Sequence, residues 1–349
     1  MSDFKQDVYY TLKSKNSGLY LDNQGVSNDG TIVTTYHYTG IDHQLWMIVP
    51  INDGNSILCS KNSGLILDNQ GVSKDGTKVT TYHYTGIDHQ FWYISPVGGE
   101  DGYYTLRSMN SGLYLDNQGV SKDGTPVTTY HRTDNNDHQL WAIEESDSKV
   151  KIPSMPTATF PPAPKFIDDH TLEPTPSPVI TNTALVPYFV VDDSFESSAK
   201  DKITNNPYYL FTKTESWKQQ AQLNNISSGD ERTYQVSSGI SSTDQSSMTK
   251  TTSMSIGEDL GFSFGPLSES ISVSFSEELQ VSESHSSTQS TEETYTLTHV
   301  NSKKYTESWA LFYVQEDYKL LRSDGSLVAD PWSLLNSTKS GEAVWPEEL

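Results

Sequence analysis

Three segments of the chain carry the same set of side chains that could bind or react with a ligand. The first spans 17–27, returns at 63–73 with Ile66 in place of Tyr20, and returns unchanged at 111–121. Each copy contains an aspartate, and each is followed by an Asp-Gly-Thr turn, a Val-Thr-Thr-Tyr-His run and a closing Asp-His-Gln-Leu/Phe-Trp. Carboxylate, tyrosine, histidine and glutamine therefore recur together in every copy.

Such a set could serve catalysis, metal binding or recognition of a polar ligand. The Asp42-His43 pair and its copies resemble part of a catalytic constellation, but no nucleophile recurs beside them. The Asp-Asn-Gln-Gly-Val-Ser run is acidic, but it lacks the oxygen spacing and the terminal glutamate of an EF-hand loop. We therefore expect no enzyme activity, no bound metal and no cofactor, and we interpret the set as a binding site.

The elements that must position this set are short strands. Within a copy the runs alternate in polarity and are broken by Asn, Asp and Gly, which is typical of strands joined by tight turns. The runs of the first copy are 9–13, 19–21, 32–36 and 45–49. A unit of this size cannot bury its apolar face alone, so three units closed around a pseudo-threefold axis predict a 12-stranded β-trefoil. Its core is expected to hold Trp46, Trp92 and Trp141.

These residues carry a family resemblance. The Gly-Leu-Tyr-Leu-Asp segment, the Asp-Gly-Thr turn and the terminal Gln-Leu-Trp are similar to the ricin B-type lectin repeat, with its Gln-x-Trp signature, over residues 8–145. The resemblance implies that a carboxylate accepts hydrogen bonds from vicinal sugar hydroxyls. It also implies that an aromatic ring stacks on the sugar and that groups beside the glutamine complete the rim.

Transferred onto this chain, the resemblance implies three carbohydrate sites. Site 1 is Asp22, Thr34, Tyr36, His43 and Gln44. Site 2 is Asp68, Thr80, Tyr82, His89 and Gln90, and site 3 is Asp116, Thr128, Tyr130, His138 and Gln139. The alternative for each aspartate is a carboxylate that only fastens its own turn, and for each histidine it is a structural hydrogen bond.

The sugar itself stays open, because the repeats depart from the family. Histidine precedes the glutamine where asparagine is common, and tyrosine replaces a frequent tryptophan. Galactose or N-acetylgalactosamine is the favoured class. Because all three copies keep the full residue set, linked weak sites should raise avidity on a glycan-dense cell surface.

A proline-rich segment ends the repeats. Nine of the 16 prolines lie between 153 and 187, which favours extended chain and excludes regular helix. We therefore expect a trefoil over 1–147, a linker over 148–180 and a β-rich domain over 181–349. The predicted fold class is all-β, with an N-terminal β-trefoil and a C-terminal elongated β-sheet or β-sandwich domain that contains a long amphipathic hairpin.

The hairpin is predicted over 247–284. Apolar residues hold even positions before Gly265-Pro266 and odd positions after it, so a two-residue turn there places both sets on one face. The candidate membrane residues are Met248, Met254, Ile256, Leu260, Phe262, Phe264, Gly265, Pro266, Leu267, Ile271, Val273 and Phe275. A strand of such alternation, repeated in many copies, could close a transmembrane β-barrel. However, Glu258, Glu269 and Glu277 fall on the apolar face, and a soluble sheet with one packed face has the same pattern.

A lectin head joined to a Ser/Thr-rich β domain with one amphipathic hairpin resembles aerolysin-type pore-forming toxins. It also resembles the Bacillus insecticidal crystal proteins that carry trefoil domains. This resemblance implies a toxin that binds cell-surface glycans, forms a homo-oligomer and enters the target-cell membrane. The alternative is a non-lytic multivalent agglutinin whose second domain mediates dimerisation or partner binding.

Composition sets further limits. The formal net charge of −22 argues against nucleic acid as a partner. The single cysteine, Cys59, rules out intrachain disulfides. The first residues lack the basic start and apolar core of a signal peptide, so we expect a secreted or crystal-deposited extracellular toxin without a cleaved signal.

Overall fold

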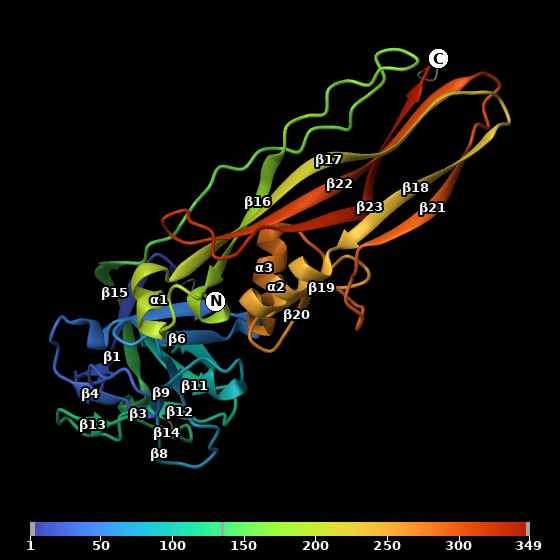
Figure 1. Cartoon of the computed structure of the whole chain (residues 1–349). Helices are drawn as coiled ribbons and strands as arrows, with labels where there is room; N and C mark the ends of the chain where they lie inside the picture. The colour runs from blue at the N-terminus through green and yellow to red at the C-terminus, as the bar shows by residue number, and fades with distance from the viewer. Residues whose placement is uncertain (1–3, 101, 134–135, 347–349) are drawn as a thin grey trace.

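The computed structural model describes residues 4–100, 102–133 and 136–346, and the first three residues used in the signal-peptide argument lie outside this part. A rounded β domain sits at one end of a long, narrow sheet, and the last strand of the chain ends near the far tip of that sheet (Figure 1). The all-β fold class is confirmed, because strands dominate both halves. In the described residues, no helix is both long and apolar enough to cross a bilayer.

The first domain is a β-trefoil of three repeats. The strands of the first repeat are β1 (Val8–Ser14), β2 (Tyr20–Asp22), β3 (Thr31–Ile32), β4 (Thr34–Tyr36) and β5 (Trp46–Pro50). Those of the second are β6 (Ser56–Ser60), β7 (Ile66–Asp68), β8 (Thr77–Lys78), β9 (Thr80–Tyr82) and β10 (Trp92–Pro96). Those of the third are β11 (Tyr103–Ser108), β12 (Tyr114–Asp116), β13 (Thr125–Pro126), β14 (Thr128–Tyr130) and β15 (Trp141–Lys149).

Short 3-10 helices connect these strands. They are η1 (Asp42–Gln44), η2 (Asn52–Gly54), η3 (Asp88–Gln90) and η4 (Asp137–Gln139). The helices η1, η3 and η4 are the Asp-His-Gln motifs of the three repeats. They carry the predicted histidine and glutamine of each site.

The closing tryptophans form the centre of the trefoil core, as predicted. Trp46, Trp92 and Trp141 are each 0% exposed. Each indole N–H also donates to a backbone carbonyl of its own repeat, at Leu21, Leu67 and Leu115. The hydrogen bond satisfies the polar atom that a buried tryptophan would otherwise leave without a partner.

Neighbouring repeats are joined by the short strands β3, β8 and β13. Strand β3 pairs with β9, β8 pairs with β14, and β13 pairs with β4, so each repeat adds a short strand to its neighbour. The Asp-Gly-Thr turn that precedes this short strand is therefore carried into the neighbouring repeat. This exchange decides the composition of the binding sites described below.

The second domain is a six-stranded antiparallel sheet. Its order is β16 (Val179–Pro187), β17 (Tyr208–Ile226), β22 (Glu307–Leu321), β23 (Trp332–Trp345), β18 (Glu231–Ile240) and β21 (Glu293–Val300). Between β16 and β17 lie η5 (Tyr188–Val190) and α1 (Ala199–Asn205), close to the trefoil.

The proline-rich segment is a strap rather than a free tether. Residues 151–165 form no helix or strand, and the strap runs along the long sheet toward its tip and back (Figure 1). The indole N–H of Trp217 donates to the carbonyl of Pro161 at 2.9 Å, and the Phe160 ring lies 5.0 Å from the Trp217 ring. Phe166 is 7% exposed and packs in a small cluster with Phe312. These contacts fasten the strap to the sheet.

The predicted hairpin over 247–284 is wrong as a description of this state. The segment instead forms α2 (Ser242–Thr252), β19 (Met254–Ile256), β20 (Phe262–Phe264), η6 (Glu269–Ile271) and α3 (Ser272–Leu279). Met254 pairs with Phe264, so the turn lies between Ile256 and Phe262 rather than at Gly265-Pro266. The Ser241 hydroxyl accepts from the backbone N–H of Asp244 and caps α2, a signal that the strand interpretation passed over.

Burial explains this conformation. Of the candidate membrane residues, six are buried to 2% exposure or less: Met248, Met254, Ile256, Phe262, Ile271 and Phe275. Leu260 and Phe264 pack at the edge of the same cluster, whereas Leu267 and Val273 are exposed. Folded back this way, the segment lies between the sheet and the trefoil and covers apolar surface of both (Figure 1). An extended hairpin in water would expose those side chains.

Candidate carbohydrate sites

Site 1 is built on the β2–β4 ladder. Asp22 ends β2 and lies opposite Thr34, and its side chain is only 4% exposed. After Asn23, the residues Gln24 and Gly25 adopt left-handed backbone angles, with φ of 63° and 69°. That turn directs the backbone N–H of Gln24 onto Oδ1 of Asp22 at 2.6 Å. The carboxylate thus fastens its own turn with one oxygen, as the alternative interpretation foresaw.

The other oxygen of Asp22 takes part in no hydrogen bond within the described residues. Asp22 lines a hollow of about 390 Å³ at the surface. The lining residues are Asp22, Gln24, Thr34, Tyr36, Thr39, Ile41, His43 and Gly124. Four of the five predicted residues of site 1 are therefore brought together. Gly124 comes from the third repeat, so the hollow is shared between repeats.

Gln44 has a supporting position behind the hollow. Its side chain is 0% exposed, and its Oε1 accepts from the backbone N–H of Thr39 at 2.9 Å. Its amide donates to the carbonyl of His37 at 2.8 Å. Gln44 therefore holds the loop that forms one wall, and in this state it does not line the hollow.

Exposed tyrosines provide the aromatic surface at sites 1 and 3. Tyr36 is 37% exposed and Tyr130 is 38% exposed, although both end strands whose other residues are buried. Each ring lies about 4.5 Å from the ring of the following histidine. A flat ring beside a carboxylate-lined hollow suits a sugar, which offers hydroxyls on its rim and C–H groups on its faces.

Site 3 repeats the geometry of site 1. Asp116 is 4% exposed, lies opposite Thr128, and accepts the backbone N–H of Gln118 on Oδ1. Gln139 is again 0% exposed and donates to a backbone carbonyl, that of His131. Arg132 stands where the first repeat has Tyr38, and its guanidinium donates to Gln139 at 3.2 Å. Residues 134–135 of the adjoining loop lie outside the described part.

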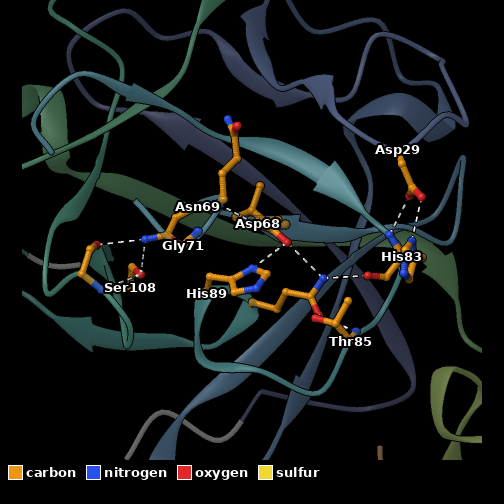
Figure 2. A network of polar contacts seen from close by, with 12 residues as sticks. Asp29, Asp68, Asn69, Gly71, His83, Thr85, His89 and Ser108 are labelled. Atoms are coloured by element: carbon orange, nitrogen blue, oxygen red, sulfur yellow. Dashed lines mark hydrogen bonds and ion pairs between the residues drawn. The ribbon is translucent and has the colours of Figure 1, made fainter. Parts of the chain in front are cut away.

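Site 2 has the same residues in a different arrangement. Oδ2 of Asp68 lies 2.9 Å from Nδ1 of His89 and 3.1 Å from the amide nitrogen of Gln90 (Figure 2). At sites 1 and 3 the equivalent histidines, His43 and His138, instead lie against a glycine of the preceding turn. The second carboxylate of the series is therefore engaged on both oxygens, by the turn and by the Asp-His-Gln motif.

A second set of histidines was not predicted and joins the repeats. His37 contacts Asp123, His83 contacts Asp29 and His131 contacts Asp75, each through Nδ1 and the backbone N–H. The hydrogen bond from His131 lowers the pKa of Asp75, and that from His37 lowers the pKa of Asp123. Both motifs are visible in every copy. Only the exchange of short strands between repeats shows that they meet across copies.

In the first acidic turn, Asp22 and Asn23 both make hydrogen bonds within the fold. Asn23 accepts from the backbone N–H of Gly25 and donates to Ser63, and Asp22 accepts from Gln24. Within the described residues, the side chains placed closely enough to share a metal ion are Asp168, Asp169 and His170, all exposed on the strap. They lie in a different part of the molecule from the three trefoil sites.

Two family models match this chain. Residues 3–82 and 88–159 match the model described as ricin-type beta-trefoil lectin domain-like. Residues 179–346 match the model of the insecticidal crystal toxin, P42. Residues 160–178 of the proline-rich strap separate the two matches.

Individual proteins are also similar to the chain. Two proteins named binary larvicide subunit BinA, from Lysinibacillus sphaericus, are each 29% identical over 217 residues, which is 61% of this chain and 57% of theirs. The match thus spans a little over half the length of these relatives. The crystal structure of Cry35Ab1 superposes with a TM-score of 0.80, at 20% identity, over 99% of this chain and 91% of its own. That likeness shows a shared fold over both domains.

Proposed function

We propose that this chain, in which a ricin-type β-trefoil lectin domain precedes an insecticidal crystal toxin domain, is a carbohydrate-binding toxin. The trefoil attaches the protein to cell-surface glycans, with galactose or N-acetylgalactosamine as the favoured sugar. The second domain then forms a homo-oligomer whose hairpins join into a β-barrel pore in the target membrane. The protein reaches that membrane from outside the cell, secreted or released from a crystal.

The attachment step is supported by the hollow at site 1 and by the matching geometry of site 3. In each, a nearly buried carboxylate keeps one oxygen outside the hydrogen bonds of the fold, next to an exposed tyrosine ring. A charged acceptor makes hydrogen bonds about twice as strong as a neutral one, so vicinal hydroxyls are a suitable partner. A single such site binds weakly, and repetition around the trefoil adds avidity on a membrane crowded with glycans.

The membrane step is supported by the register of β18 and β21. These strands flank the folded-back segment and already pair with each other, from Glu231 opposite Val300 to Ser238 opposite Glu293. If the same ladder is continued residue by residue, Phe264 falls opposite Leu267. Gly265 and Pro266 are then left as a two-residue turn. In the proposed pore, the ladder would thus continue without any slip in register into the hairpin that the sequence pattern predicts.

The two faces also continue without interruption. In the present ladder, Tyr234 and Val236 on β18 and Leu297 on β21 contribute to one apolar cluster. These are even positions before the turn and odd positions after it. Apolar residues of the segment keep this parity, from Met254 to Phe264 and from Leu267 to Val281. An extended hairpin would thus present one continuous apolar face, as a lipid-facing strand pair requires.

Extension requires the segment to leave its present packing. Its buried side chains contribute to a cluster shared with the sheet and the trefoil, and that burial stabilises the soluble form. Lipid and neighbouring hairpins must replace the lost contacts. This exchange explains why attachment to a membrane and oligomerisation come before insertion in the proposed order.

Insertion can be tested by scanning the segment with a polarity-sensitive fluorophore. Single cysteines at 254–264 and 267–275, in a Cys59→Ala background, are labelled and mixed with phosphatidylcholine vesicles that carry a galactose-terminated glycolipid. We expect blue-shifted emission at even positions before Gly265-Pro266 and at odd positions after it. Helical spacing of the shifts, or no shift at any position, would overturn the pore.

Dye release from the same vesicles distinguishes the proposed toxin from the agglutinin. We expect release that free lactose suppresses and that vesicles without glycolipid do not show. Aggregation of the vesicles without release of dye would favour a non-lytic multivalent lectin instead. Binding to neither glycolipid vesicles nor a glycan array would contradict the carbohydrate-binding function as a whole.

A further inference from the structure

Residues 265–273, here called the hairpin tip, begin at the turn of the proposed hairpin. In this structure they are fastened to the trefoil at its second repeat. Asn52, in η2, donates to the backbone carbonyl of Glu269 at 2.8 Å and to the hydroxyl of Ser272 at 3.0 Å. Its side-chain oxygen accepts the backbone N–H of Val273 at 3.3 Å. A single asparagine of the trefoil thus holds both the first residue of η6 and the start of α3.

The loop next to site 2 makes the second set of contacts. The hydroxyl of Tyr84 lies 2.8 Å from that of Ser270. A Cβ added to Gly86 would lie 2.2 Å from the carbonyl oxygen of Pro266, so the two backbones are in direct contact. Tyr84 also packs against Phe189 of the second domain, and burial raises the pKa of its hydroxyl to about 12.

This loop leads directly to the carboxylate of site 2. Thr85 follows Tyr84, and both its backbone N–H and its hydroxyl donate to Oε1 of Gln90. The amide of Gln90 then donates to Oδ2 of Asp68, which also contacts His89 (Figure 2). Three residues therefore separate the hairpin tip at Ser270 from the carboxylate oxygen that a sugar would need.

The equivalent loop of the first repeat is free of such contacts. Tyr38, which corresponds to Tyr84, is 58% exposed, and the loop that follows it is exposed as well. There the described residues show no hydrogen bond between the histidine and the carboxylate, and the histidine lies over Gly25. The second repeat also has Ile66 where the others have tyrosine, and Ile66 is fully buried in the cluster shared with the second domain. An aspartate hydrogen-bonded on both oxygens thus occurs in the repeat against which the hairpin tip packs.

We infer that the packed hairpin tip holds site 2 closed, so that sugar binding at site 2 and release of the hairpin favour each other. The inference rests on the proposed function, because it concerns the same sugar and the same hairpin. Sites 1 and 3 are open for the first attachment. A sugar at site 2 must displace His89 and Gln90 from Asp68, and coupling between two sites acts equally in both directions.

Crosslinking the tip to the trefoil tests this coupling. Asn52→Cys with Ser272→Cys, in a Cys59→Ala background, joins two side chains whose polar atoms lie 3.0 Å apart. We expect the oxidised protein to bind N-acetylgalactosamine, galactose or lactose at sites 1 and 3 alone in a titration without membranes. The reduced form of the same variant is the control, and it should gain the third site. Equal numbers of sugars bound in both forms would overturn the inference.

A measurement without sugar keeps the test independent of the lectin function. Asp68→Asn retains an acceptor for the turn but weakens the contact with His89, and Asp22→Asn and Asp116→Asn are the matched controls. We expect backbone amides of 265–273 to exchange about fivefold faster or more in Asp68→Asn alone, the lower range for coupling between sites. Equal exchange in all three variants would refute the coupling. If no sugar binds any form, the proposed function fails and this measurement alone decides the inference.

Discussion

The Nδ1 atom of His37 lies 2.7 Å from a carboxylate oxygen of Asp123, although the two residues belong to the first and third repeats. The backbone N–H of His37 donates to the other oxygen at 2.8 Å. The same pair of contacts recurs between the other repeats. Three such His–Asp clamps therefore fasten each repeat to its neighbour. Each clamp also places an Asp-Gly-Thr turn beside the neighbouring site.

The clamps should make the stability of the trefoil depend on pH in the acidic range. The pKa of Asp75 and that of Asp123 lie below the ordinary 3.8 because each carboxylate accepts hydrogen bonds from histidine. Their contribution is therefore complete above pH 3.8 and is lost as the pH falls through the lowered pKa. We expect Asp123→Asn to melt a few degrees below the wild type at pH 6, with the difference shrinking below pH 3.8. A difference that is constant over this range in thermal melts would contradict the clamp.

The three site aspartates should carry attachment together. Replacing Asp22, Asp68 and Asp116 by Ala removes every charged acceptor of the sites, and linked sites contribute about a hundredfold or more in avidity. We expect binding to glycan-bearing cells to fall by at least that factor. Asp330→Ala, an exposed charge change in the second domain, is the control and should bind like the wild type. Undiminished attachment by a triple variant with normal melting behaviour would rule out these sites.

Gly86 and Gly40 offer a matched pair for the hairpin tip. Both glycines have left-handed φ, 74° and 69°, so alanine strains the backbone at each to a similar extent. Only Gly86→Ala adds a clash with the carbonyl of Pro266, whereas a Cβ at Gly40 would meet the Tyr38 ring at an ordinary contact distance of 3.9 Å. We expect Gly86→Ala to lower the glycolipid density needed for dye release, with Gly40→Ala unchanged. Similar behaviour of the two variants would mean that this contact does not restrain the segment.

The three glutamates on the apolar face should limit insertion. Glu258, Glu269 and Glu277 are exposed in this structure, so Gln at each position should leave the fold intact. In the extended hairpin these charges face lipid at a cost in free energy. We expect the triple Glu→Gln variant to release dye at about tenfold lower protein concentration, since about 1.4 kcal/mol gives such a factor. Release at the wild-type concentration would place these residues away from lipid.

Much of the trefoil could be predicted from the sequence. Short strands, turn residues and a closing tryptophan recur in each copy, so the repeat specifies both the fold and the positions of the aspartates and tyrosines. The contacts between His37 and Asp123 could not be predicted, because both motifs occur in every copy and nothing in their spacing says which copies meet. That choice follows from the exchange of β3, β8 and β13 between repeats.

The segment over 247–284 shows the limit of periodicity. Ile271, Phe275 and Leu279 are odd positions and share one face of a strand, but they are also four residues apart and share one face of a helix. The sequence by itself therefore determined which residues face together and a register consistent with β18 and β21. Only the tertiary structure decided that α3 forms here, because burial against the sheet and the trefoil outweighs an extended hairpin in water. The same packing distinguishes site 2 from its sequence copies.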